Sequence, residues 1–159
     1  MKKITPFLWF EKNAGEAARF YVTVFKGSKI KSSTALPDTP SGPIEIFTVE
    51  LLGQKLTLMG PGAPFKFNGS VSFVVQCETQ REIDYYWKRL SADPKAEQCG
   101  WLKDKFGLFW QIVPTILSQM LSDKDQKKTA RVTEAFLKMK KFEIARLKTA
   151  YEGKKQDRP

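Results

Sequence analysis

The sequence lacks histidine altogether. Histidine is the commonest metal ligand in proteins and the commonest general base near neutral pH. Its absence excludes most designs of a metal centre. Any acid–base chemistry would have to use Asp, Glu, Lys, Tyr or Cys side chains.

Cysteine is scarce, with only Cys77 and Cys99 in the chain. We predict that both lie in strands as small buried residues. Their number permits one disulfide, but two cysteines in a cytosolic domain of this size usually remain reduced.

Long hydrophobic runs are absent as well. No segment approaches eighteen uninterrupted apolar residues, so the sequence predicts no membrane-spanning helix. The N-terminal "MKKITPFLWFEKN" begins like a signal peptide, but its apolar run ends at Phe10 and no small-residue cleavage site follows. With 159 residues and 42% hydrophobic content, the chain has the size and composition of one globular domain, which we expect to be cytoplasmic.

Positive charge, in contrast, is plentiful and unevenly distributed. The chain has 27 Lys and Arg residues against 17 acidic ones, and 12 of the former with only 5 of the latter lie from Lys124 onward. Such a tail can bind nucleic acid or an anionic membrane, or it can form a solvated helix face. The basic positions lack the interleaved stacking aromatics that single-strand binders use, which favours the solvated face.

The apolar pattern predicts the same order of elements twice: a strand, a helix and further strands. The first copy has a helix that Asn13 could cap at its start and that Gly27 could end. Its strands are predicted over residues 4–10, 28–37, 44–53 and 54–60. After a linker rich in Pro and Gly, the second copy has a helix that begins with Thr79 and Glu82 as a capping box. A turn-rich piece over 91–98 follows this helix, and the strands of this copy span 70–77, 99–104 and 108–114. Each copy alone leaves one sheet face half exposed, so pairing the copies would bury both faces.

The C-terminal third is predicted to be helical. Val132, Phe136 and Met139 form one apolar stripe, and a second stripe of different phase follows at Ile144, Leu147 and Tyr151. The change of phase predicts a break near residues 141–142, and Ser122 or Asp123 could cap the first helix. We expect these helices to pack on the sheet or on a second subunit.

Four segments carry a resemblance to a known family: "ITPFLWFEKNAGEAARFYVTVFKGSKI", "FKFNGSVSFVVQCETQREIDYYWKRL", "CGWLKDKFGLFWQIVP" and "FLKMKKFEIARLKTAYEG". They resemble the demethylubiquinone methyltransferase-like family of the vicinal oxygen chelate superfamily, to which glyoxalase I and the bleomycin-resistance proteins belong. The resemblance implies an α+β fold with two βαβββ modules, near 4–60 and 70–114, that form a curved, glyoxalase-like mixed sheet. It also implies a glyoxalase-like domain over 1–114, a C-terminal helical extension over 115–159 packed on the domain or on a dimer partner, and a homodimer.

The resemblance further implies where a pocket would lie. In metal-dependent relatives, His or Glu ligands face inward from the first and last strands of each module, and Thr5, Ser70 and Gln111 occupy such positions here. Neutral oxygens are poor ligands for a divalent metal ion in a tight site. Gln111 is therefore expected to be the remnant of a ligand in a metal-free pocket, unless it only bonds a buried backbone group.

The expected pocket has aromatic walls with two polar contacts, Ser72 and Gln111. Such a lining suits a flat or partly apolar organic molecule. Each aromatic residue could instead belong to the core. The proposed walls are Phe7, Trp9, Phe73, Trp101 and Phe109.

The historical family name predicts a methyltransferase, but the sequence does not support an S-adenosylmethionine site. Such a site typically needs a Gly-rich turn between a strand and a helix. The Gly-rich segment "GPGAP" instead lies between predicted strands and contains two prolines. It ends at Pro64, where the family usually has a histidine, so whatever that histidine does in relatives is in doubt here. We expect no cofactor.

Three hypotheses for function follow. We favour a metal-independent small-molecule-binding protein whose reaction, if any, the sequence does not specify. The first alternative is a metal-dependent enzyme of lyase or dioxygenase type; its carboxylates would have to come from Glu11, Glu45, Glu50 and Asp104, none of which is at a ligand position. The second alternative is a nucleic-acid-binding module formed by Lys127, Lys128, Arg131, Lys138, Lys140, Lys141, Arg146 and Lys148.

Overall fold

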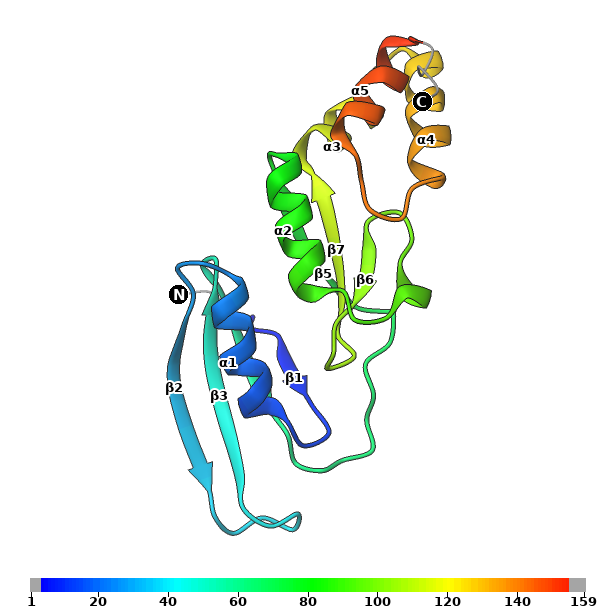
Figure 1. Cartoon of the computed structure of the whole chain (residues 1–159). Coiled ribbons are helices and arrows are strands. Elements are labelled where there is room, and N and C mark those ends of the chain that lie inside the picture. Colours follow the sequence, from blue (N-terminus) through cyan, green and yellow to red (C-terminus); the bar gives the residue numbers. More distant parts are fainter. Residues whose placement is uncertain (1–3, 155–159) are drawn as a thin grey trace. The chain divides into compact units, whose positions relative to one another are not determined.

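The computed structural model describes residues 4–154 and divides into two compact units, Met1–Phe67 and Asn68–Pro159 (Figure 1). The first unit contains a sheet of four strands in the order β1-β4-β3-β2, in which β1 runs parallel to β4 and the other neighbours are antiparallel. Its elements are β1 (Phe7–Trp9), α1 (Ala14–Val24), β2 (Lys29–Leu36), β3 (Ile44–Leu51) and β4 (Gln54–Met59). This is the predicted βαβββ order.

Helix α1 packs on one face of this sheet. Alanines at positions 14, 17 and 18 keep the contacting side of α1 small, and Tyr21 is fully buried beside them. The strands alternate, so that Phe47, Val49 and Leu58 are buried while their sequence neighbours face the other way. Asn13 lies at the start of the helix as predicted, but its side chain makes no capping hydrogen bond.

The second unit has a sheet of three strands in the order β5-β7-β6, with β5 parallel to β7 and β6 antiparallel to β7. The strands are β5 (Ser72–Cys77), β6 (Trp101–Lys103) and β7 (Phe109–Pro114), and α2 (Gln80–Leu90) covers one face (Figure 1). The predicted capping box is confirmed: the Glu82 amide donates to Thr79 Oγ1 at 3.2 Å, and the Thr79 amide donates to Glu82 Oε2 at 3.0 Å. The α+β plan with two related modules is therefore present, and the second module is one strand shorter than the first.

The segment before β6 accounts for the shorter module. It forms the 3₁₀ helix η1 (Pro94–Ala96) and then a two-residue turn, across which Gln98 pairs with Trp101. The turn residues Cys99 and Gly100 have φ of +49° and +82°, the left-handed pair that joins strands in the tightest hairpins. The prediction that Cys99 lies in a strand was therefore wrong, whereas Cys77 is buried in β5, and both thiols are free.

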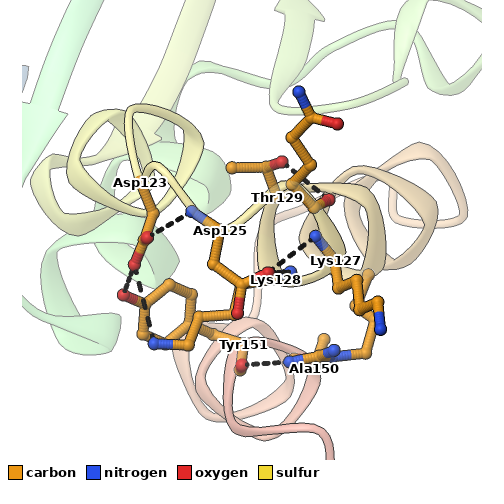
Figure 2. Close-up of polar contacts among 9 residues, drawn as sticks. Asp123, Asp125, Lys127, Lys128, Thr129, Ala150 and Tyr151 are labelled. Carbon is orange, nitrogen blue, oxygen red and sulfur yellow. Dashed lines mark hydrogen bonds and ion pairs between the residues drawn. The ribbon is translucent and has the colours of Figure 1, made fainter.

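Three helices complete the second unit: α3 (Thr115–Leu121), α4 (Gln126–Leu137) and α5 (Ile144–Glu152). The predicted break near residues 141–142 is confirmed by the linker between α4 and α5. The predicted caps of the first long helix were wrong, because Asp125 caps α4 by accepting from the Lys127 amide at 2.9 Å. Figure 2 shows why Asp123 is not the cap: its carboxylate accepts from the Asp125 amide and the Tyr151 hydroxyl, and it pairs with Lys128.

Within residues 4–154, no helix is long and apolar enough to span a membrane. The hydrophobic core of the helical part includes Val132, Met139 and Leu147, which are buried. Val132 of α4 and Met139 of the linker belong to the first predicted stripe, and Leu147 of α5 belongs to the second.

Candidate functional site

The candidate site lies on the face of the β5-β7-β6 sheet that is opposite α2. Strand β7 alternates along its length: Trp110 and Ile112 are buried on the α2 side, whereas Gln111 is half-buried on the other. On the same open face, Val74 of β5 is paired with Gln111 and is 50% exposed. The sheet thus presents a partly apolar surface with one amide in its central strand.

Gln111 and Ser72 form a hydrogen-bonded pair on this face. The Gln111 Nε2 group donates to Ser72 Oγ at 2.8 Å, and both residues are half-buried. Among the described residues this is the one hydrogen bond of the Gln111 side chain, so its Oε1 atom and its second amide hydrogen stay available. The alternative in which Gln111 bonds a buried backbone group is not what the structure shows.

Two aromatic rings lie beside this pair. Trp101 of β6 is paired with Gln111 in the sheet register, and its ring centroid is 6.4 Å from that of Phe109, with an angle of 66° between the planes. Lys103 is paired with Phe109, and its Nζ lies 5.9 Å from the Phe109 ring centroid. The Lys103 charge is matched by Asp93, whose Oδ2 is 2.5 Å from Nζ. Four of the predicted site residues, Ser72, Trp101, Phe109 and Gln111, therefore share one face of one sheet.

Phe73 does not belong to this group, and its prediction as a pocket wall was wrong. Successive residues of a strand point to opposite faces, so Phe73 cannot share the face of Ser72. Its ring instead lies 5.5 Å from the ring of Trp110, on the α2 side of the sheet.

The buried carboxylate of Asp104 fixes the β6–β7 hairpin, which places Trp101 opposite Gln111. The sequence alone suggested Asp104 only as a possible metal ligand. Asp104 is 3% exposed and accepts hydrogen bonds from the Phe106 and Leu108 amides at 2.9 and 3.0 Å and from the Trp110 indole at 2.8 Å. These donors satisfy the charge inside the protein and hold the turn that sets the register. An aspartate at the start of "DKFG" signals such a turn, but the indole contact has no sequence signal.

The other two predicted contacts, Phe7 and Trp9, belong to the first unit. They lie on the face of β1 opposite α1 and are 47% and 40% exposed. The Trp9 ring is 6.4 Å from that of Phe7 and 5.8 Å from that of Phe65. Exposed aromatics clustered on an open sheet face are suited to contact with a ring or an apolar group.

The residues at the superfamily's metal-ligand positions have side chains that do not suit a divalent metal ion. Thr5 precedes β1, and Ser70 lies in an exposed turn in which its amide donates to Asn68 Oδ1 at 2.9 Å. Within the part of each unit that the structure describes, no three His, Cys, Asp or Glu residues are grouped to hold a metal ion. Gln111, the third position, is bonded to a serine hydroxyl. The donors at these positions are neutral, unlike the carboxylates, thiolates and imidazoles of divalent-metal sites.

The buried thiol of the second unit is not a nucleophile at neutral pH. Burial, with a smaller contribution from the Glu82 charge, raises the pKa of Cys77 to about 12. The thiolate, which is the reactive form of cysteine, is then essentially absent at neutral pH.

The chain resembles proteins with related folds. The family model described as 3-demethylubiquinone-9 3-methyltransferase matches residues 2–113. The PhnB protein from Bacillus cereus, which carries the name of the same family, is 31% identical, with a TM-score of 0.61 over 72% of this chain and 100% of its own. A comparison with curated proteins found no match.

Two more distant structures share the fold alone. The protein PA1353 from Pseudomonas aeruginosa is 18% identical, with a TM-score of 0.57 over 72% of this chain and 98% of its own. The fosfomycin resistance protein FosX from Listeria monocytogenes is 14% identical, with a TM-score of 0.56 over 77% of this chain and 100% of its own. A mutant of FosX was solved as a complex with Mn(II) and a dihydroxypropylphosphonic acid.

Proposed function

The chain belongs to the 3-demethylubiquinone-9 3-methyltransferase family, within the glyoxalase-like (vicinal oxygen chelate) superfamily, and on this premise we propose that it binds a small organic molecule without a metal ion. The observation that carries the proposal is the Ser72–Gln111 pair on an open sheet face, with Trp101 and Phe109 beside it. The free oxygen and hydrogen of the amide can bond a ligand, and the rings can contact its apolar surface.

The surroundings favour an uncharged, flat ligand. Lys103 is the cation next to the rings, and Asp93 already matches its charge at 2.5 Å. The polar contacts of the site are therefore a hydroxyl and an amide, which recognise carbonyl, hydroxyl or amide groups. Phe7 and Trp9, exposed aromatics on the open face of the first unit's own sheet, remain proposed ligand contacts of that unit.

Two features argue against methyl transfer from S-adenosylmethionine as the reaction. The Gly-rich segment that starts at Gly60 connects β4 to β5 and enters no helix. Helix α2 of the second unit, which begins shortly after β5, starts with a Thr79–Glu82 capping box. A carboxylate there occupies the helix N-terminus that would otherwise bind a phosphate or carboxylate group of a cofactor.

The structure offers little support for the nucleic-acid alternative. Six of its eight candidate residues already have partners: Lys128 with Asp123, Arg131 with two carbonyl oxygens of α5, Lys138 with Glu134, Lys140 with Glu97, Lys141 with Asp84 and Arg146 with Glu143. Paired cations release fewer counterions on contact with phosphates, so they contribute less to binding.

We further propose that the protein is a cytoplasmic homodimer. Sedimentation at micromolar concentration tests the homodimer directly.

Binding measurements test the proposal. Thermal-shift screening against quinones, other aromatic compounds and antibiotics should yield at least one stabilising compound. Calorimetry with that compound should show a loss of about tenfold in affinity for Gln111→Leu, because one to two hydrogen bonds disappear. Gln119→Leu, which removes an exposed amide of α3 away from the site, is the matched control and should leave affinity unchanged.

Three outcomes would contradict the proposal. The first is a screen without any stabilising compound, and the second is a Gln111→Leu protein that binds as tightly as the wild type. The third is stoichiometric zinc, nickel or iron in protein purified without chelator, which would favour the metal-dependent alternative.

A further inference from the structure

The helices that follow β7 lie outside the part of the chain that the family match covers. That match ends at residue 113, and the Bacillus cereus relative is covered completely by 72% of this chain. Helices α3 to α5 begin at Thr115. Their contacts with the rest of the second unit therefore indicate what these C-terminal helices do.

The linker 138–143 between α4 and α5 binds the turn that precedes β6, as Figure 1 shows. The amides of Cys99 and Gly100 donate to the carbonyl oxygens of Met139 and Lys140, at 2.8 and 2.7 Å. Consecutive amides in left-handed conformation point to the same side and form a small concave donor site. The linker carbonyls fill this site.

A ring and an amide reinforce the contact. Phe142 is 2% exposed and packs so closely on Gly100 that a Cβ atom there would lie 2.8 Å from its Cδ2. Gln80 of α2 holds the linker from the other side: its Nε2 donates to the Phe142 carbonyl at 3.0 Å, and its Oε1 accepts from the Ile144 amide at 2.9 Å. The linker is thus bound to both the turn and α2.

The turn of Cys99 and Gly100 also restrains Trp101, the residue that follows it. The Trp101 amide donates to the Gln98 carbonyl at 2.8 Å, and the Ile112 amide donates to the Gly100 carbonyl at 2.8 Å. Trp101 has therefore little freedom to move relative to β7 as long as the turn is held. If the turn were released, the end of this three-residue strand would lose its support.

We propose that the linker 138–143 positions Trp101 for ligand contact by holding the turn of Cys99 and Gly100, an inference that rests on the function proposed above. Phe142 and Gln80 are positioning residues, since neither is part of the open sheet face. The C-terminal helices thus determine the shape of one side of the ligand site although they do not line it.

Nuclear magnetic resonance of the full chain without ligand tests the positioning directly. In Phe142→Leu and Gln80→Ala proteins, the Trp101 indole signal should shift and the Cys99 and Gly100 amides should exchange with solvent roughly tenfold faster, as expected when a local hydrogen bond opens more often. Arg131→Ala is the matched control. Its side chain joins α4 to the Ala150 and Tyr151 carbonyls of α5, away from the turn, so it should change neither signal.

Ligand affinity forms the second arm, with the uncharged 2,3-dimethyl-1,4-naphthoquinone as the probe. A weaker affinity in Phe142→Leu and Gln80→Ala but not in Arg131→Ala is the expected result. An unmoved Trp101 indole signal in both linker variants, or an equal shift in Arg131→Ala, overturns the positioning role. A wild-type protein that fails to bind any screened compound contradicts the proposed function instead, and the ligand-free signals still decide the role of the linker.

Discussion

Replacing Gly100 by alanine should destabilise the second unit more than the same change at another glycine of similar conformation. Gly100 has φ of +82°, and a Cβ atom there would lie 2.8 Å from Phe142 Cδ2 and 2.9 Å from the Ile112 carbonyl oxygen. Both distances are below those that real Cβ atoms show, so the Phe142 ring must move. The carbonyl belongs to the backbone of β7 and cannot move without disturbing the sheet.

The expected cost has two parts. A left-handed conformation costs alanine about 1–2 kcal/mol. Loss of the burial of Phe142 adds up to about 1.5–3 kcal/mol, so the free energy of unfolding should fall by about 2.5–5 kcal/mol in total. Gly107→Ala provides the matched control: Gly107 has φ of +87°, but a Cβ atom added there would meet no atom within 4 Å, so only the first part applies.

Urea denaturation monitored by tryptophan fluorescence measures both variants, since three of the four tryptophans, at positions 87, 101 and 110, belong to the second unit. The double variant Gly100→Ala with Phe142→Ala should be less destabilised than the sum of the single changes, because the smaller side chain removes the clash. Equal losses for Gly100→Ala and Gly107→Ala, or strict additivity in the double variant, would refute the reasoning.

Three further predictions concern the same unit. Trp110→Phe removes the indole donor from buried Asp104 and should lower the free energy of unfolding by about 1–3 kcal/mol in the same denaturation assay. The backbone amides at the start of α2 hold the pKa of Glu82 below its ordinary value of 4.5. The stabilisation of the folded state by the ionised Glu82 side chain is therefore fully present above that pH, and it is lost as the pH falls through the lowered pKa. The stability advantage of the wild type over Glu82→Gln should therefore shrink between pH 7 and pH 3, and a constant difference would contradict this. Iodoacetamide at pH 8 should label half-exposed Cys99 but not Cys77, whose pKa is about 12, and mass spectrometry of the folded protein detects the difference.

Local patterns predicted the parts of the fold that depend on local physics. The alternation of Phe109, Trp110 and Gln111 is enough to place the amide and the buried indole on opposite faces of β7. The Thr79–Glu82 capping box needs only two residues three positions apart. The same rule of alternation, applied to Ser72 and Phe73, would have excluded Phe73 from the pocket wall.

The features that the sequence did not reveal depend on partners far along the chain. Ser122, Asp123 and Asp125 are all acceptable caps, and the choice depends on Asp123 being engaged by Tyr151, 28 positions later. Cys99 has no turn preference of its own, and the tight turn is recognisable only from Gly100 and the linker that binds it. The burial of Asp104 likewise depends on the Trp110 indole rather than on any local pattern.

The neutral residue at position 111 is consistent with the charges around it. A glutamate there would place a half-buried carboxylate beside Trp101 and Phe109 with the Ser72 hydroxyl as its neighbouring donor, and a buried charge needs a cation or several donors. The cation on this face, Lys103, is already paired with Asp93. An amide avoids this cost, because it bonds Ser72 and still presents a donor and an acceptor to a ligand. Gln111, the Lys103–Asp93 pair and the absence of histidine thus all agree with the proposal of a site for an uncharged molecule.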